Sequence, residues 1–339
     1  MKNRIPPEKR KPIKPSGPPT EWDGIAGWYD QLVGDAGSEY HRHVIIPGVL
    51  RLLAIRPGET VLDVACGQGV LCRVLHHAGA NVTGVDASDK LLRIARQRSE
   101  LAIEYIRADA RDLSSLPAGR YSAATLVLAV QNIHPLPPLF EGVARCLTGR
   151  GEGVSPLRIA GILPASNEGI LPSRVAGVPP ARGVSTAANS AAVAPIASPS
   201  PRLVIVMTHP CFRGPKATSW GWDEQAGVQF RRVDRYLLPR KEPIVTHPGS
   251  DPTHYTWTFH RPLQTYVKAL RNAGLLIDAL EEWPSHKVSE SGPRGPAENA
   301  ARKEIPMFLA LRAVKVAPSI AIAGSDDIVE LATPCETER

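Results

Sequence analysis

The sequence lacks the features that mark a membrane protein, a disulfide-stapled protein or a zinc protein. No stretch reaches the roughly 18 consecutive apolar residues that a membrane-spanning helix needs. The five cysteines are odd in number and form no CxxC pair, so neither a disulfide framework nor a structural zinc site is expected. The N-terminus has no apolar stretch of the kind found in signal peptides. These absences favour a soluble, cytoplasmic protein without a membrane span.

Aromatic residues are also scarce, at 5% of the chain, and the net charge of +7 is unevenly distributed. The first 20 residues contain six lysines and arginines and one glutamate, whereas residues 317–339 contain five acidic residues and one arginine. A basic, proline-rich end is more typical of a disordered tail than of a nucleic-acid-binding arm. We therefore expect disordered tails at 1–20 and 317–339, one folded domain at 21–316, and no nucleic-acid partner.

Between these tails, short apolar runs rich in β-branched residues alternate with segments of helical periodicity. The pattern predicts seven strands, at residues 60–65, 81–85, 103–107, 123–130, 202–208, 276–283 and 307–314. It predicts helices at residues 40–54, 70–77, 89–99, 138–147 and 261–273. Strands that alternate with helices pair in parallel through right-handed crossovers. The expected fold class is α/β, with a seven-stranded, doubly wound and mostly parallel sheet.

Residues 151–200 interrupt this alternation. Three imperfect copies of an eight-residue unit begin at Gly161, Gly169 and Gly177, and each contains proline. Such a period fits neither a helix nor a ladder strand, so we expect a low-complexity insertion, with a partner-binding arm as the alternative. Residues 212–260 are rich in tryptophan, tyrosine and arginine, and we expect them to form a small cap.

A glycine-containing turn follows the first predicted strand, within the segment VLDVACGQGV at residues 61–70. Glycine lets a ligand approach the backbone closely, and the next helix offers free N–H groups at its N-terminus. A dinucleotide-binding dehydrogenase would have the pattern GxGxxG, but Cys72 stands in place of the third glycine. Asp63, inside the strand, favours a ligand that carries an ammonium group and no pyrophosphate.

Carboxylates also follow the next two predicted strands. Asp86 is suited to accept hydrogen bonds from a ribose diol, which dinucleotides and S-adenosylmethionine both contain. Asp109 is suited to the exocyclic amine of adenine, beside the backbone N–H of Ala110. Each carboxylate alone could equally be a helix cap or a solvated loop residue. The ordered succession of Asp63, Asp86 and Asp109 favours an adenosine-containing ligand.

The segment Val61–Leu147 resembles the Rossmann-like class I methyltransferases, in particular the small-molecule group that includes ubiquinone and menaquinone biosynthesis enzymes. VLDVACGQG is similar to that family's VLDLGCGTG, with Ala65 in place of the first glycine. The resemblance implies the cofactor S-adenosylmethionine, an antiparallel last strand and a cap over the methyl acceptor. The cofactor-binding residues that it implies are Tyr29, Asp63, Ala65, Gly67, Gly69, Asp86, Ala87, Asp109, Ala110 and Val130.

Two histidines follow the fourth and fifth predicted strands, whose ends face the sulfonium in this fold. His134 and His209 are therefore candidate catalytic bases, although a histidine at a strand end is often a hydrogen-bonded structural residue. The aromatic residues of the expected cap favour a flat or apolar acceptor, or else form the cap's own core: Trp220, Trp222, Tyr236, Tyr255 and Trp257. The histidines of that segment, His247, His254 and His260, are too widely spaced to predict a metal site.

Together, the sequence predicts an enzyme that transfers a methyl group from S-adenosylmethionine to a small molecule. An RNA or protein methyltransferase is one alternative, which the basic N-terminus and Arg231, Arg232 and Arg235 favour. A non-catalytic scaffold that binds S-adenosylmethionine is the other. The sequence indicates neither the acceptor atom nor the oligomeric state.

Overall fold

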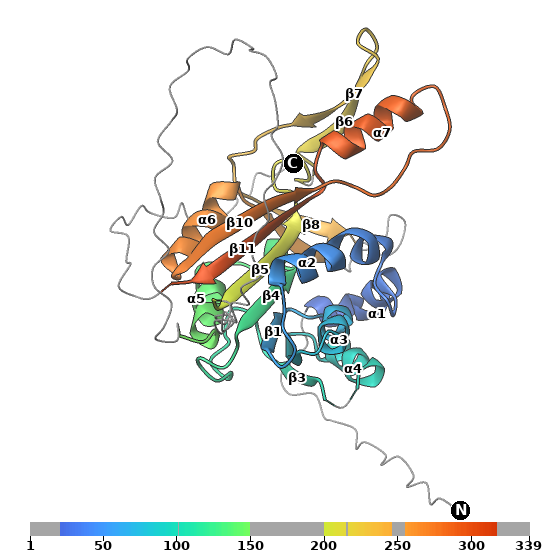
Figure 1. Cartoon of the computed structure of the whole chain (residues 1–339). Coiled ribbons are helices and arrows are strands. Elements are labelled where there is room, and N and C mark those ends of the chain that lie inside the picture. The colour runs from blue at the N-terminus through green and yellow to red at the C-terminus, as the bar shows by residue number, and fades with distance from the viewer. Residues whose placement is uncertain (1–20, 101, 150–199, 215, 246–254, 317–339) are drawn as a thin grey trace, which may run out of the picture. The chain divides into compact units, whose positions relative to one another are not determined.

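The fold is described from a computed structural model, which covers residues 21–100, 102–149, 200–214, 216–245 and 255–316. The two predicted tails and the predicted insertion, apart from its last residue, lie outside these described residues. A seven-stranded sheet is the central element, in the order β10-β11-β5-β4-β1-β2-β3 (Figure 1). Its strands are β1 (Thr60–Val64), β2 (Asn81–Asp86), β3 (Glu104–Arg107), β4 (Ala123–Val127), β5 (Arg202–Thr208), β10 (Leu275–Trp283) and β11 (Phe308–Lys315).

The pairing of the strands confirms the predicted sheet. Strands β1 to β5 are mutually parallel, and β11 is antiparallel to both of its neighbours, β5 and β10. The chain runs from β1 outward to β2 and β3, then returns to the other side of β1 for β4 and β5. Open α/β sheets bind ligands at such a reversal, beyond the carboxyl ends of the strands. The ends of β1 and β4 therefore define where a ligand is expected.

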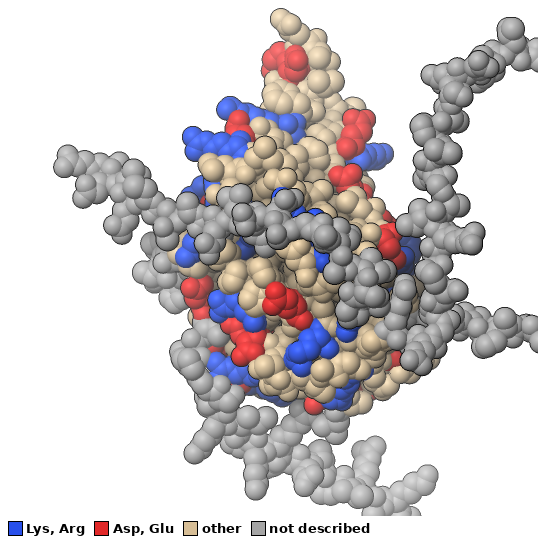
Figure 2. Space-filling model, turned by 90° about the vertical axis from the view of Figure 1, so that its left-hand side faces the viewer, with Lys and Arg blue, Asp and Glu red and all other residues tan. Residues whose placement is uncertain are grey.

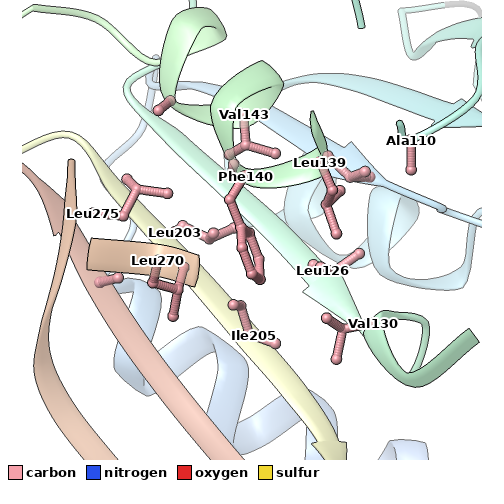
Figure 3. Close-up of a cluster of buried hydrophobic side chains, with 14 of the residues drawn as sticks. Ala110, Leu126, Val130, Leu139, Phe140, Val143, Leu203, Ile205, Leu270 and Leu275 are labelled. Atoms are coloured by element: carbon pink, nitrogen blue, oxygen red, sulfur yellow. The ribbon is translucent and has the colours of Figure 1, made fainter. Parts of the chain in front are cut away.

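Helices cover both faces of the sheet. The described α-helices are α1 (Glu21–Val33), α2 (Ile46–Leu53), α3 (Val70–His77), α4 (Asp89–Arg98), α5 (Pro137–Cys146), α6 (Leu263–Asn272) and α7 (Gly295–Glu304). Helices α5 and α6 pack on one face, where Phe140 points toward Leu203 and Ile205 of β5 (Figure 3). Helices α2, α3 and α4 cover the opposite face (Figure 1). No described helix is long and apolar enough to cross a membrane.

The alternation of buried residues along each strand explains this two-sided core. In β5, Leu203 and Ile205 belong to the cluster on one face and Val204 and Val206 to the cluster on the other. A strand buried on both faces is the expected state of a parallel sheet under two helical layers. Burying a side chain such as Phe140 completely contributes about 1.5–3 kcal/mol. The core thus fixes the sheet whose strand ends carry the candidate site.

Two helical predictions differ from the structure. The predicted helix 40–54 begins with a π-helical turn, His41–Ile45, before α2. No helix was predicted between the last two strands of the chain, where α7 lies. Helix α7 offers little periodic signal because Ala301 is its one buried apolar side chain. Helix α7 instead contacts the strand β7 (Val228–Val233).

Residues 212–260, predicted as a cap, contain two antiparallel hairpins. The first pairs β6 (Thr218–Asp223) with β7, and it was not predicted. The second pairs β8 (Arg240–Val245) with β9 (Tyr255–His260). The strands β6 and β7 lie together with α7 in Figure 1.

Candidate cofactor-binding site

The turn between β1 and α3 has a backbone that only small residues accept. Ala65, Gly67 and Gly69 have positive φ values of 54°, 57° and 80°. A Cβ atom on Gly69 would lie 2.3 Å from the Tyr105 hydroxyl, and one on Gly67 would lie 3.2 Å from the Tyr29 ring. Both glycines are therefore required by close neighbours as well as by φ. Ala65 tolerates its conformation at a cost of roughly 1–2 kcal/mol.

Asp86, at the end of β2, braces this turn. Its Oδ2 accepts the N–H of Gly67 at 2.9 Å, and its Oδ1 accepts the N–H of Ser88 at 2.8 Å. Burial raises the pKa of the Asp86 carboxyl to about 6, although both backbone hydrogen bonds favour the charged form. Each oxygen keeps a further lone pair, so the carboxylate retains acceptor capacity for a diol.

Asp63 lies behind the turn, with both oxygens already engaged. Thr125 Oγ1 donates to Oδ1 at 2.7 Å, and Cys72 Sγ donates to Oδ2 at 3.2 Å. Burial is the main cause that raises the pKa of Asp63 to about 6. Cys72, which argued against a dinucleotide pattern, thus has a structural partner in this carboxyl group.

Helix α1 packs against the start of α4 and carries Tyr29 over the turn. Asp23, only 4% exposed, accepts hydrogen bonds from Ser88 Oγ at 2.7 Å and from the Lys90 N–H at 3.1 Å. Arg98 donates to Asp30 at 2.9 Å, further along the same helix. Burial, with a smaller contribution from the charge of Asp86, raises the pKa of Tyr29. The phenol is therefore neutral and forms a wall beside Gly67.

A cavity of about 1010 Å³ opens in front of this turn. The predicted site residues that line it are Tyr29, Ala65, Gly67, Asp86, Ala87, Asp109, Ala110 and His134. The others, which do not line it, are Asp63, Gly69, Val130 and His209. The volume is at the upper end of the range of small-molecule sites, about 300–1,000 Å³, which suits a cofactor and a second small molecule together.

At the adenine end predicted from the sequence, Asp109 is paired. Arg111 approaches it with two nitrogens, Nη2 at 2.6 Å from Oδ2 and Nε at 3.0 Å from Oδ1. This guanidinium holds the pKa of Asp109 below its ordinary value. Arg111 also donates to the backbone oxygen of His134 at 3.3 Å, which ties the loop after β3 to the loop after β4. No pattern in the sequence pointed to Arg111.

The two candidate bases occupy different environments. His134 lines the cavity, stacks on Phe259 with ring centroids 5.0 Å apart, and lies with Nδ1 3.0 Å from Arg261 Nη2. His209 is 5% exposed, accepts the N–H of Cys211 on Nδ1 and donates from Nε2 to Glu282 at 2.8 Å. Burial lowers the pKa of His209. The structure brings only His134 to the cavity.

Residues 61–151 match the family model described as a methyltransferase domain. This segment is similar in sequence to methyltransferase domains. The ubiquinone biosynthesis O-methyltransferase of Bordetella avium (strain 197N) is 37% identical over 79 residues, which cover 22% of this chain and 33% of that protein. The 2-phytyl-1,4-naphtoquinone methyltransferase of Synechococcus elongatus is 33% identical over 135 residues, 37% of this chain and 57% of that protein. The chain thus spans about a third to just over half the length of these curated relatives.

The fold extends beyond the matched segment. The crystal structure of an S-adenosylmethionine-dependent methyltransferase from Mesorhizobium loti superposes with a TM-score of 0.53 at 23% identity. It covers 79% of this chain and 96% of the other chain. The resemblance to the class I methyltransferases is confirmed for the domain and for the fold.

Another part of the cavity is built from residues that the sequence analysis mostly missed. Trp22, Asn132, Lys241, Trp257 and Phe259 line it, and of these only Trp257 was anticipated. The missed residues come from separated segments, so no local pattern pointed to them.

Other aromatic residues expected near the acceptor lie elsewhere. Trp220 packs between Arg213 and Arg231, with distances of 5.3 and 5.0 Å to its ring centroid. Trp222 packs against Arg294, and the Tyr236 hydroxyl accepts the N–H of Leu263. These three side chains are not among those that line the cavity. The Tyr255 side chain lies outside the described part of the structure.

Within the described ranges, no group of three or more histidine, cysteine, aspartate or glutamate residues is arranged to hold a metal ion. His260 bonds through Nε2 to the backbone oxygen of Tyr236 at 2.8 Å. His247 and His254 are outside the described residues.

Proposed function

We propose that this chain is an enzyme that transfers a methyl group from S-adenosylmethionine to a small-molecule acceptor and releases S-adenosylhomocysteine. One observation carries the proposal. The carboxylate of Asp86 joins the glycine-containing turn to the end of β2 and faces a cavity large enough for two ligands. The segment that matches the methyltransferase family model includes this turn and the end of β2.

In this proposal, the chain binds the cofactor along the ends of three neighbouring strands. Asp86 accepts hydrogen bonds from the ribose hydroxyls, and the backbone at Asp109 and Ala110 contacts the adenine. Gly67 allows the methionine part to lie against the turn, where Tyr29 presents its ring to the positively charged sulfur. Asp63 adds negative charge behind the turn. The bound cofactor supplies an electrophilic methyl group, and the protein orients the acceptor towards it.

The acceptor in this proposal is a flat, aromatic small molecule. Trp257, Phe259 and His134 provide ring surfaces to the cavity lining, in the part that this proposal assigns to the acceptor. Two relatives are named for reactions of ubiquinone biosynthesis and of a naphthoquinone, which also points to aromatic acceptors. We place the protein in the cytoplasm, because its four described cysteines are free thiols, the state that a reducing compartment maintains.

The alternatives fit the described surface less well. An RNA methyltransferase needs a continuous basic surface to bind phosphates. On the face shown in Figure 2, the described lysines and arginines are interspersed with aspartates and glutamates. A non-catalytic scaffold would not require the open acceptor end beside the cofactor turn. A small-molecule enzyme therefore accounts for more of the cavity.

The test is to incubate the protein with S-adenosylmethionine labelled on the methyl group and three separate pools from a cell extract: small molecules, RNA and protein. Label should enter the small-molecule pool. Transfer into RNA or protein alone would contradict the proposed acceptor class, and no transfer with intact S-adenosylhomocysteine binding would favour the scaffold. An Asp86→Ala variant serves as the control and should lose transfer in every pool.

A further inference from the structure

Two cations at the acceptor end of the cavity, Arg261 and Lys241, have no carboxylate partner among the described residues. Arg261 is 3% exposed, and none of the carboxylates in the described residues forms an ion pair with it. Its guanidinium lies over Phe259 at 5.2 Å and donates to the backbone oxygen of Ile133 at 2.8 Å. A buried charge without a counter-ion is costly unless a ligand or nearby dipoles stabilise it. The carbonyl of Ile133 and the Phe259 ring stabilise this guanidinium, and its positive charge, which has no counter-ion, favours a negatively charged ligand nearby.

Arg261 also fixes the tautomer of His134. A guanidinium N–H always donates, so His134 Nδ1, 3.0 Å from Arg261 Nη2, must be the acceptor. The neutral ring consequently carries its proton on Nε2. To act as a base, His134 would have to use the lone pair that Arg261 already occupies. It would also place a second positive charge beside a buried guanidinium. His134 is thus arranged to donate a hydrogen bond.

Lys241 is a second donor at this end. It lines the cavity, and its Nζ lies 4.0 Å from the Trp257 ring centroid and 6.0 Å from that of Phe259. Within the residues that the structure describes, Lys241 forms no ion pair. Since the His134 ring also stacks on Phe259, the imidazole and the ammonium flank one aromatic surface. An aromatic ring bound there would have both donors within its reach.

The carboxylates of the cavity are occupied by other partners. Glu242 is paired with Arg240 at 2.9 Å, and Asp109 with Arg111 at 2.6 Å. Asp86 accepts two backbone N–H groups at the opposite end. Glu21, on α1, is the remaining carboxylate of the lining. Among the described residues, the cations near this end that have no carboxylate partner are therefore Arg261 and Lys241, whereas Arg111 is paired with Asp109.

We infer that the acceptor is bound as an aromatic oxyanion, a phenolate, by the Nε2–H of His134 and the ammonium of Lys241. This inference rests on the proposed function. The phenol loses its proton to solvent on binding, and no base on the enzyme is required. The phenolate oxygen then attacks the methyl carbon, a C–O bond forms as the C–S bond breaks, and the sulfur keeps the electron pair. Negative oxygen and positive sulfonium become a neutral ether and a neutral thioether. Arg261 acts as a positioning residue through His134.

The inference is testable with 4-nitrophenol, whose ionised form is identified by its visible absorbance. The probe is titrated with pH in the presence of excess protein saturated with S-adenosylhomocysteine. We expect the apparent pKa of the bound probe to fall by at least about one unit relative to the free probe, as an adjacent positive charge produces. Lys241→Met should reduce this shift by more than half. Lys303→Met, which removes an exposed lysine of α7 outside the cavity, should leave it unchanged.

The variant His134→Gln tests whether His134 acts as a hydrogen-bond donor or as a base. A glutamine amide still donates a hydrogen bond but takes no proton, so the lowered pKa of the probe should persist in this variant and disappear in His134→Phe. Loss of the shift in His134→Gln would show that His134 acts as a base and would overturn the inference. An unshifted probe, or one that does not bind to the wild type, would also overturn it.

The same samples distinguish a failure of the proposed function from a failure of the phenolate inference alone. S-adenosylhomocysteine binding is measured first by calorimetry, and thermal unfolding shows that each variant is folded. If S-adenosylhomocysteine does not bind, the proposed function fails and the inference fails with it. If it binds and the probe remains a phenol, only the inference fails.

Discussion

The two ends of the cavity are constructed differently. The end near Asp86 is made of consecutive strand ends between residues 65 and 110, where backbone conformation and close packing decide which residues fit. The acceptor end combines α1, the loop after β4 and the β8–β9 hairpin, and its properties depend on side chains. Backbone constraints of this kind leave a local sequence pattern, whereas side chains brought together from distant segments do not. The first end was therefore predictable and the second was not.

The largest effect is expected from a substitution that tests how tightly the turn at the Asp86 end of the cavity is packed. In Gly69→Ala, the new Cβ meets the Tyr105 hydroxyl at 2.3 Å, at a φ of 80°. Steric overlap and the left-handed backbone together should lower the free energy of unfolding by about 2–4 kcal/mol and abolish S-adenosylhomocysteine binding. Gly119→Ala is the matched control, because its φ is 65° and nothing lies within 4 Å of the added atom. Thermal unfolding and calorimetry should show a loss of only about 1 kcal/mol there, with binding intact. Equal effects in the two variants would refute the packing argument.

The second prediction concerns pH at the same end. Burial raises the pKa of Asp86 to about 6, and hydrogen bonds from the ribose hydroxyls favour its charged form. Binding should therefore approach full strength about one pH unit above 6 and weaken as the pH falls through 6, by up to roughly tenfold between pH 7 and pH 5. Calorimetry at several pH values measures this, in buffers with different heats of ionisation so that proton release is detected. Constant affinity over this range would argue against an ionised Asp86 in the complex.

The third prediction tests whether the two ends act independently. Trp257→Ala removes a ring surface from the acceptor end only. The affinity for S-adenosylhomocysteine should remain within about twofold, while kcat/KM for the acceptor falls roughly fivefold to tenfold, the usual worth of an aromatic contact. Trp222→Ala, on the β6–β7 hairpin, should change neither quantity. A large loss of cofactor affinity in Trp257→Ala would show that the two ends are coupled.

The smallest effect is expected at Ala65, in the turn between β1 and α3. Ala65 has a φ of 54°, and glycine adopts that conformation without steric cost. Ala65→Gly should therefore raise the free energy of unfolding by up to about 1 kcal/mol, with S-adenosylhomocysteine binding unchanged or slightly tighter. Thermal unfolding of the wild type and the variant measures the difference. A decrease in stability would mean that packing of the methyl group outweighs the backbone strain.

The same contrast explains what the sequence could predict of the fold. The seven sheet strands were found because buried strands form continuous apolar runs, as in RLVIVMT at Arg202–Thr208. Helix α7 was missed because its sequence, GPAENAARKE, has almost no apolar stripe. The β6–β7 hairpin was missed because its residues are partly or fully exposed, so its sequence lacks the continuous apolar run of a buried strand.

For the site, residue type was easier to predict than residue environment. Asp86 was expected at a strand end facing the ligand, and it lines the cavity there. Asp63 was expected to contact the ligand, but its partners Thr125 and Cys72 keep it behind the turn. His134 and His209 looked equivalent in the sequence, and only the structure separates the cavity-lining ring from the one paired with Glu282. Hydrogen-bond partners across the sheet decide these cases, and they have no local signature.

Calorimetric titration with S-adenosylhomocysteine tests the central claim most directly, on the wild type, on Asp86→Ala and on the control Asp112→Ala, which removes a carboxylate outside the cavity lining. The account predicts one binding site in the wild type, an unchanged affinity in Asp112→Ala, and a loss of about 2 kcal/mol, roughly 30-fold, in a folded Asp86→Ala. Absence of binding to the wild type, or equal affinity in Asp86→Ala, would contradict the assignment of this cavity to S-adenosylmethionine.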